Sequence, residues 1–275
     1  MKYKKLIPNS VRRIIRRSFA IPIRMKNTNL AQKFWMSENQ KRILALKNIH
    51  LGKRAFIIGN GPSLNQMDLS LLKHEITFGS NAFFLAKRKL GFLPTYYNVE
   101  DPLPAEDNAE TLNTLTDTTK IFAHDLKYCL RPSDNTLYVY FDRYYSNDSS
   151  PNFPRFSDNA LKVVYWGGTV VYMSIQLAFY MGIKEVYIIG VDLKYDVPQS
   201  AGYDSVITSE SLDENHFHPD YFGPGKRWHH PHVERMQQSI EKAAKYFEQN
   251  GGSLYNATVG GNLNVLKRAN YESLF

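Results

Sequence analysis

The chain of 275 residues contains a single cysteine, Cys129. One thiol cannot form an intrachain disulfide, and a four-cysteine zinc site is excluded as well. This composition fits a reducing compartment, and we expect a cytoplasmic protein. No apolar run reaches about 18 residues, so the sequence predicts no transmembrane helix. The basic N-terminus has neither an apolar core nor a small-residue cleavage site, so it does not resemble a secretory signal.

Acidic residues are scarce in the first part of the chain. Met1 to Arg54 contain fifteen Lys or Arg residues but one acid, Glu38. That segment carries +14 while the whole chain carries +8, which leaves −6 on the remainder. Positive charge therefore belongs to an N-terminal arm on a mildly acidic body, and we expect no nucleic-acid partner.

The arm contains the stretch IPNSVRRIIRRSFAIPIR. Four apolar residues share one helical face and four arginines cover the other, namely Val11, Ile14, Ile15 and Phe19 against Arg12, Arg13, Arg16 and Arg17. Such a helix can lie on an anionic membrane surface or dock on its own domain. We favour the membrane, and therefore expect a peripheral protein at the inner face of the cell membrane.

Beyond the arm, apolar runs alternate with helical patterns. Strands are predicted at residues 55–59, 75–81, 95–101, 120–125, 136–141, 184–193 and 253–258. Helices are predicted at residues 37–48, 69–73, 105–118, 169–181 and 233–250. This alternation predicts an α/β fold with a mostly parallel, Rossmann-like sheet and helices on both faces, a variant of the GT-A type.

Two long polar segments, residues 142–160 and 196–232, lack periodicity, and segments of this kind are usually lids or binding loops. We divide the chain into a basic amphipathic arm and helix at 1–50 and a nucleotide-binding catalytic domain at 51–275. A lid-like insertion is expected at about 196–232.

The first predicted strand ends in the turn Gly59, Asn60, Gly61, Pro62, Ser63. Open α/β sheets bind ligands beyond the carboxyl ends of their strands. Glycines allow close approach to the backbone, and free N–H groups can meet a phosphate or a nucleobase. The turn matches neither the GxGxxG fingerprint nor the phosphate loop that ends in Gly-Lys-Ser/Thr. We predict a nucleotide-type ligand, with a tight strand-to-helix turn as the alternative.

Four segments carry a resemblance to known proteins: FIIGNGPSL, FGSNAFF, YYNVED and GIKEVYIIGVDL. Together they resemble the bacterial sialyltransferases of glycosyltransferase family 42. They are also similar to the broader MptE-like superfamily, which includes flagellin-modifying motility accessory factors and an archaeal pterin diphosphokinase. The similarity covers about residues 54–260 and leaves out the arm.

The sialyltransferase resemblance implies a function. It implies transfer of an acidic sugar, sialic acid-like or Kdo-like, from a CMP-activated nucleotide-sugar donor. The acceptor would be a cell-surface glycan or glycolipid, such as lipopolysaccharide or capsule. The reaction would be inverting, and it would need neither a cofactor nor a metal.

The same resemblance implies a donor site. The turn from Gly59 to Ser63 would line it, and Asn81 and Asn98 would reach the nucleotide or the donor sugar. Both asparagines follow or end predicted strands at one sheet edge, where an amide can donate and accept. Gly168 and Thr169 open a predicted helix whose N-terminus suits an anion. Thr169 is all that remains of the family's Arg-x-Thr-Ser-Gly segment.

Five of the eight histidines lie between His216 and His232. A general base that works near neutrality is most readily a histidine. In family 42 such a base shortly precedes a long helix, which implies His229 or His230 here, with His216 and Tyr221 as further candidates. We rank His230 first, then His216, then His229. A metal site or plain loop histidines are the alternatives.

The leaving phosphate of CMP needs stabilisation as the glycosidic bond breaks. Tyr195 and Tyr203 occupy places comparable to the tyrosines that do this in family 42. Lys194, Lys226 and Arg227 would serve the same purpose with a full charge.

Two other functions remain open. The first is a diphosphokinase that uses ATP with Mg²⁺, with Glu100, Asp101 and Asp192 at strand ends as metal ligands. Under the transferase interpretation Asp192 instead belongs to the donor site. The second is a non-catalytic nucleotide-binding protein of a glycan-assembly complex.

Overall fold

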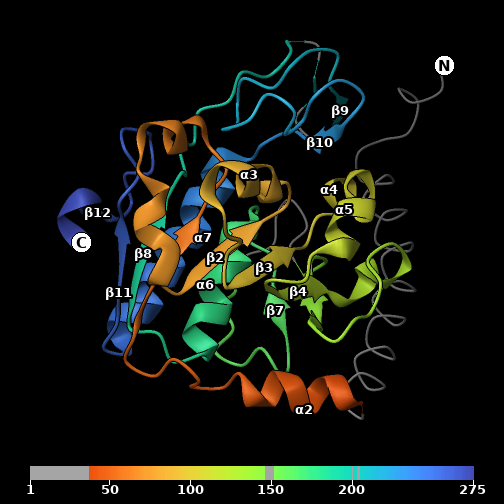
Figure 1. Cartoon of the computed structure of the whole chain (residues 1–275). Helices are drawn as coiled ribbons and strands as arrows, with labels where there is room; N and C mark the ends of the chain where they lie inside the picture. The colour runs from red at the N-terminus through yellow and green to blue at the C-terminus, as the bar shows by residue number, and fades with distance from the viewer. Residues whose placement is uncertain (1–36, 146–151, 200, 203–204) are drawn as a thin grey trace.

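The computed structural model describes residues 37–145, 152–199, 201–202 and 205–275 (Figure 1). At its centre lies an eight-stranded sheet in the order β12-β11-β8-β1-β2-β3-β4-β5. The strands are β1 Arg54–Ile58, β2 Thr77–Ser80, β3 Tyr96–Val99, β4 Thr119–Ala123, β5 Thr136–Val139, β8 Glu185–Ile189, β11 Ser253–Asn256 and β12 Lys267–Arg268. Every neighbouring pair is parallel. The predicted α/β fold is therefore confirmed, and each predicted strand is present.

The central strands are buried along almost their whole length. In β1 every residue from Ala55 to Ile58 is buried, and in β8 the same holds from Val186 to Ile189. A parallel strand covered on both faces reads as a continuous apolar run, which is why these two segments stand out in the sequence.

Helices cover both faces of the sheet. Helix α6 (Val170–Tyr180) packs on β1, β2 and β3 and on α7 (Val233–Gln249), which also contacts β11. From β1 to β5, each new strand is added on one side of β1, whereas β8, β11 and β12 are added on its other side. Because crossovers between parallel strands are right-handed, connections that run in these two directions lie on opposite faces of the sheet. The strand order reverses between β1 and β8, and such a switch point is where open α/β sheets bind ligands.

The remaining helices are short. They are α2 Glu38–Ala45, α3 Lys87–Leu90, α4 Pro102–Asp107 and α5 Ala109–Thr114, and the 3₁₀ helices η2 Pro62–Gln66, η3 Leu69–His74, η4 Phe83–Ala86, η5 His124–Tyr128 and η6 Glu272–Leu274. The single helix predicted over 105–118 is wrong. It breaks at Asn108, which leaves helical geometry (φ −121°, ψ 13°) and donates from its side chain to the carbonyl of Pro104.

Helix α2 covers the β5 edge of the sheet. The Asn39 amide donates to the carbonyl of Tyr138 at 2.8 Å and accepts from its N–H at 2.9 Å. Arg42 donates to the carbonyl of Thr136 at 3.0 Å. These bonds satisfy backbone groups that an edge strand would otherwise expose. The predicted amphipathic helix of the arm lies outside the described residues.

The segment 196–232 contains a small antiparallel ribbon, β9 (Val206–Thr208) with β10 (Arg227–His229), at the top of Figure 1. A second small sheet pairs β6 (Phe141–Asp142) with β7 (Val164–Tyr165). Strands of two or three residues show no periodicity, so neither sheet was predicted.

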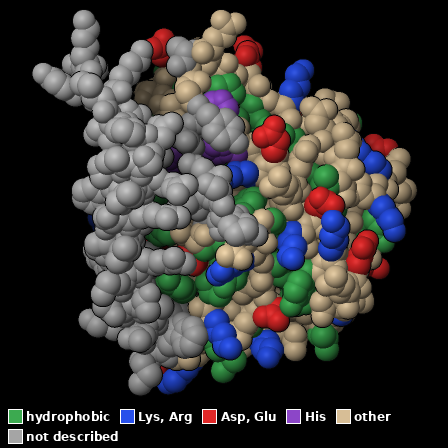
Figure 2. All heavy atoms as spheres, turned by 180° about the vertical axis from the view of Figure 1, so that it is seen from behind, with side chains coloured by type: hydrophobic (Ala, Val, Ile, Leu, Met, Phe, Trp, Pro, Cys, Tyr) green, Lys and Arg blue, Asp and Glu red, His purple; other side chains and the backbone are tan. Residues whose placement is uncertain are grey.

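On the described part of the face seen in Figure 2, Lys and Arg side chains lie among Asp and Glu side chains. No helix in the described part of the chain is both long and apolar enough to cross a membrane.

Candidate active site

A cavity of about 460 Å³ lies at the carboxyl edge of the sheet, within the usual size of small-molecule sites. Its floor comes from the strand ends and the start of α6: Gly59–Gly61, Asn81, Glu100–Asp101, 168–171 and 190–195. Its roof comes from the segment 196–232: Ser205, Asn215, His216, Tyr221, Phe222 and 228–232. The structure thus brings the predicted nucleotide turn and the predicted histidines together.

The glycines after β1 allow two strand ends to meet. A Cβ on Gly59 would lie 2.2 Å from the carbonyl oxygen of Gly190, and one on Gly61 would lie 1.8 Å from Oδ2 of Asp192. Gly59 donates its N–H to Ile189 at 2.7 Å, and Gly61 donates to Gly190 at 2.8 Å. The predicted free N–H groups are wrong for these two residues, because the end of β8 takes both. The chain itself requires these glycines, which also line the cavity.

Pro62 and Ser63 begin η2 and do not line the cavity. The Ser63 hydroxyl donates to Oδ2 of Asp192 at 2.8 Å. Burial raises the pKa of Asp192, and the bond from Ser63 works in the opposite direction. Ser63 therefore holds a carboxylate in the cavity wall.

Three asparagines lie in or just after three successive strands. Asn60 donates to the hydroxyl of Ser80 at 3.1 Å, and Asn98 donates to that of Ser174 at 2.8 Å. The Oδ1 atoms of Asn60, Asn81 and Asn98 are buried and accept no hydrogen bond within the described residues. Asn60 and Asn81 line the cavity, whereas Asn98 does not. A buried acceptor without a donor costs about 1–3 kcal/mol, so the first two suit a ligand that brings donors.

His229 is held by a carboxylate from another part of the chain. Its Nδ1 lies 2.9 Å from Oδ2 of Asp101, whose Oδ1 caps α4 by accepting the N–H of Leu103 at 2.9 Å. The hydrogen bond to Asp101 raises the pKa of His229. With Nδ1 committed to Asp101, Nε2 is the atom left to exchange a proton.

The first residue of strand β10, Arg227, is also bound to α4. Arg227 binds Asp107, with Nε 3.0 Å from Oδ1, and Glu106 at 2.8 Å. Lys226 donates to Oδ1 of Asn108 at 3.0 Å. Neither basic side chain lines the cavity, and both hold the roof in place through these contacts.

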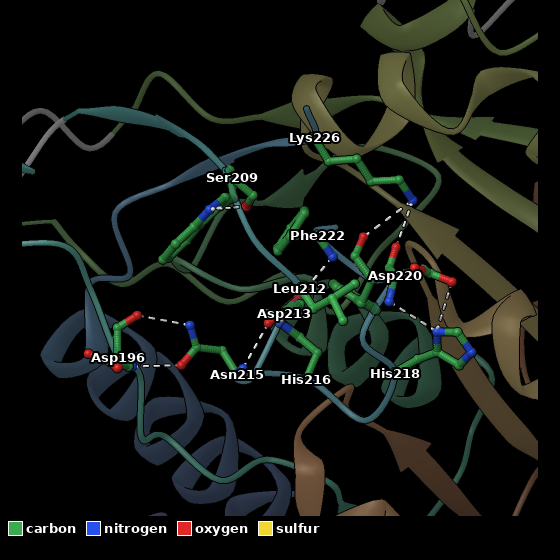
Figure 3. Close-up of polar contacts among 12 residues, drawn as sticks. Asp196, Ser209, Leu212, Asp213, Asn215, His216, His218, Asp220, Phe222 and Lys226 are labelled. Atoms are coloured by element: carbon green, nitrogen blue, oxygen red, sulfur yellow. Dashed lines mark hydrogen bonds and ion pairs between the residues drawn. The ribbon is translucent and has the colours of Figure 1, made fainter. Parts of the chain in front are cut away.

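A second histidine, His216, is also paired with a carboxylate. Its Nδ1 lies 2.8 Å from Oδ2 of Asp213, which also accepts the N–H of Phe222 at 2.9 Å (Figure 3). Burial alone would raise the pKa of Asp213, but the bonds from His216 and the backbone lower it overall. The imidazole stacks on Tyr221, with ring centres 4.0 Å apart and planes 7° apart. Its side chain is 12% exposed, against 48% for His229.

The other histidines of this segment differ in position. His230 and His232 line the cavity, and Nδ1 of His230 donates to the carbonyl of Pro231 at 3.1 Å. His218 does not line it, and its Nδ1 accepts the N–H of Asp220 at 3.1 Å (Figure 3). No observation tests the ranking of His230 first, but the carboxylate partner of His229 makes His229 the candidate used below.

The predicted tyrosines also differ in whether they line the cavity. Tyr195 lines the cavity, and burial raises its pKa to about 12, so its hydroxyl keeps its proton near neutrality. Burial also raises the pKa of Tyr221, which lines the cavity as well. Tyr203 lies outside the described residues.

Several residues that line the cavity were not predicted from the sequence. Arg143 binds Asp125 at 2.8 Å and Glu100 at 3.3 Å, and burial raises the pKa of Glu100 to about 7 in spite of that partner. Arg235 lies over the rings of Phe153 and Trp166, at 5.1 and 5.4 Å. Arg143 directly follows β6 and Trp166 directly follows β7, and strands of two residues leave no pattern in the sequence that would mark them.

The three carboxylates expected to hold Mg²⁺ in a diphosphokinase have other partners. Glu100 faces Arg143, Asp101 faces His229, and Asp192 accepts from Ser63. Among the residues placed by the structure, no three His, Cys, Asp or Glu side chains gather as a metal site. Each of the three carboxylates therefore already binds another side chain of the protein.

A doubly wound parallel sheet with a roofed cavity at its switch point defines a Rossmann-like α/β protein, an architecture that commonly binds nucleotides. The family model described as "6-hydroxymethylpterin diphosphokinase MptE-like" matches residues 28–197, and the chain belongs to this MptE-like family. The resemblance to the superfamily noted in the sequence is thereby confirmed. No curated protein sequence matches the chain.

Two solved structures align with the chain. The MAf glycosyltransferase from Magnetospirillum magneticum AMB-1 aligns with a TM-score of 0.52 and 15% identity, over 82% of this chain and 34% of that one. The chain thus spans about a third of that structure's length. The sialyltransferase CstII from Campylobacter jejuni, solved with the substrate analogue CMP-3FNeuAc, aligns with a TM-score of 0.42 and 18% identity, over 79% and 86% of the two chains. At 15% identity the first likeness establishes the fold alone.

Proposed function

We propose that the protein is a glycosyltransferase that moves an acidic sugar from a CMP-activated donor to a hydroxyl of a cell-surface glycan, with inversion. The observation that carries this proposal is the pair formed by Asp101 and His229 in the cavity wall, 2.9 Å apart. A histidine oriented by a carboxylate is the arrangement that a general base needs to deprotonate an acceptor hydroxyl.

The geometry suggests what each group does. Nε2 of His229 takes the acceptor proton, and Asp101 stabilises the imidazolium that forms. The unpaired Oδ1 atoms of Asn60 and Asn81 accept from nucleotide donors such as the cytosine amino group or a ribose hydroxyl. The hydroxyl of Tyr195, which keeps its proton, donates to the phosphate.

Negative charge on the donor has partners in the same cavity. Lys194 and Arg235 line it, and so does the N-terminus of α6 at Gly168 and Thr169. Helix N-termini and basic side chains stabilise phosphate and carboxylate groups. We assign this side of the cavity to the anionic part of the donor, and Asp192 to its nucleotide end.

A diphosphokinase is the second candidate, because the family description names that activity. It would require ATP and Mg²⁺, for which the three carboxylates at the strand ends do not form a shared site. A calorimetric screen of CMP, UDP, GDP and ATP, each with and without Mg²⁺, separates the two. We expect CMP to bind without Mg²⁺. Binding of ATP alone, and only with Mg²⁺, would overturn the transferase proposal.

The catalytic part of the proposal needs a variant and a matched control. Replacing a general base costs about 10²–10⁴-fold in rate, so His229→Asn should lose transfer while binding CMP normally. His218→Asn alters a histidine of the same segment outside the cavity and should keep normal transfer. Normal transfer by His229→Asn would refute its role as the base.

We also propose that the N-terminal arm holds the protein at an anionic membrane surface, at the inner face of the cell membrane. The support is the charge of the first 54 residues and the opposition of apolar and arginine faces in their sequence. A glycolipid acceptor would then be within reach.

A further inference from the structure

Two histidines of the cavity wall, His229 and His216, are each paired with a carboxylate, whereas deprotonation of the acceptor needs one pair. We propose that the second pair, His216 with Asp213, supplies the general acid that protonates the leaving phosphate of the donor. This inference rests on the proposed function and adds a catalytic residue to it.

The position of His216 assigns it to the nucleotide side. The N–H of the next residue, Phe217, donates to the carbonyl of Asn60 at 2.9 Å, and Asn65 donates to the carbonyl of Phe217 at 2.9 Å. His216 is therefore attached directly above the turn after β1, at the switch point. His229 is attached to Asp101, after β3.

The spacing of the two pairs suits an in-line displacement. Strands β1 and β3 are separated only by β2, hence by about 10 Å. In an inverting reaction the acceptor oxygen and the leaving oxygen lie on opposite sides of the anomeric carbon. A base on the β3 side and an acid on the β1 side match the two ends of that reaction axis.

The surroundings of His216 hold it in one orientation. Asp213 fixes Nδ1 at 2.8 Å, and Tyr221 stacks on the ring. Asp213 is itself held by the N–H groups of Asn215 at 2.8 Å and Phe222 at 2.9 Å. Asn215 is fixed in turn, since its amide bonds both backbone groups of Asp196, with Nδ2 to O at 2.9 Å (Figure 3). A ring that is 12% exposed and held by these contacts presents Nε2 without reorganisation.

The acceptor oxygen forms a bond to the anomeric carbon and gives its proton to Nε2 of His229. The bond between that carbon and the phosphate oxygen breaks, and its electron pair stays on the phosphate. Nε2–H of His216 gives its proton to a phosphate oxygen of the departing CMP, and solvent returns a proton to His216 afterwards.

The test measures CMP release from a CMP-activated acidic sugar, with and without acceptor. His216→Asn should lower both rates by about 10²–10⁴-fold, because the leaving phosphate then receives no proton from this position. His229→Asn should lower transfer more than acceptor-independent release. His218→Asn is the control and should match the wild type. His216→Gln serves as a second variant if the first does not fold, with CMP binding by calorimetry as the check.

The outcomes are distinct. Normal CMP release by a folded His216 variant would overturn the inference, and so would a loss of CMP affinity with an unchanged maximal rate. If the wild type neither binds CMP nor releases it from any donor, the proposed function fails and this step fails with it.

Discussion

Asp101→Asn tests the candidate base with little damage to the fold. The side chain does two things: Oδ1 caps α4 through the N–H of Leu103, and Oδ2 holds Nδ1 of His229. Asn and Asp are equally good helix N-caps, so the substitution keeps the cap. Asp101→Ala would also lose the cap, at about 1 kcal/mol. The difference between the two variants therefore separates helix stability from catalysis.

The catalytic effect follows from the charge. A hydrogen bond to an ionised partner is about twice as strong as a neutral one, and the bond from His229 to Asp101 would become neutral. We expect transfer to fall by roughly 10- to 100-fold, less than the ~10²–10⁴-fold loss when the base itself is removed. Asp101 raises the pKa of His229, so without its charge that pKa falls. The rising limb of the pH–rate profile should move to lower pH.

The free energy of unfolding should also depend on pH through the raised pKa of His229. A histidine whose pKa is raised by folding stabilises the native state fully below its unfolded pKa of about 6.5 and stops doing so as pH rises through the folded value. Asp101→Asn should therefore be destabilised more at pH 5.5 than at pH 9 in urea unfolding. His229 is 48% exposed, so solvent screening keeps the difference in destabilisation between the two pH values small. The reasoning is refuted if the rising limb of the pH–rate profile does not move and Asp101→Asn loses the same stability at both pH values.

Gly61→Ala forces Asp192 aside and should weaken both folding and CMP binding. The control Gly202→Ala, which has no atom within 4 Å of the new Cβ, should change neither. Thermal unfolding and calorimetry measure the two effects. Burial raises the pKa of Glu100 to about 7, so the unfolded state loses this proton first and stability falls as pH rises from about 4.5 to 7. Glu100→Gln should gain stability relative to the wild type at pH 8 but not at pH 4, and an equal difference at both would contradict it. Transfer should persist in EDTA; complete loss restored by Mg²⁺ or Mn²⁺ would favour the diphosphokinase. Deleting residues 1–25 should abolish salt-sensitive binding to anionic liposomes while sparing a soluble acceptor, and unchanged binding would count against the arm.

The sequence predicts most of the sheet because burial on two faces leaves a local signal. After their first residues, β1 and β8 are apolar and buried, and their carboxyl ends carry the glycines and Asp192 that mark the cavity. The histidines of the segment 196–232 stand out by number alone. Short elements such as β6, β9 and β12 gave no signal, because two or three residues cannot show a period.

The sequence by itself determined the α/β class, the ligand edge and the group of residues from which a base is chosen. Only the tertiary structure decided which of them meet. Asp101 and His229 are 128 positions apart, and no local pattern joins them. The glycines after β1 were predicted to approach a ligand, but they approach the end of β8, whose position depends on the order of the strands. Periodicity records whether a residue is buried, whereas the partner it meets is set by how distant strands and helices pack.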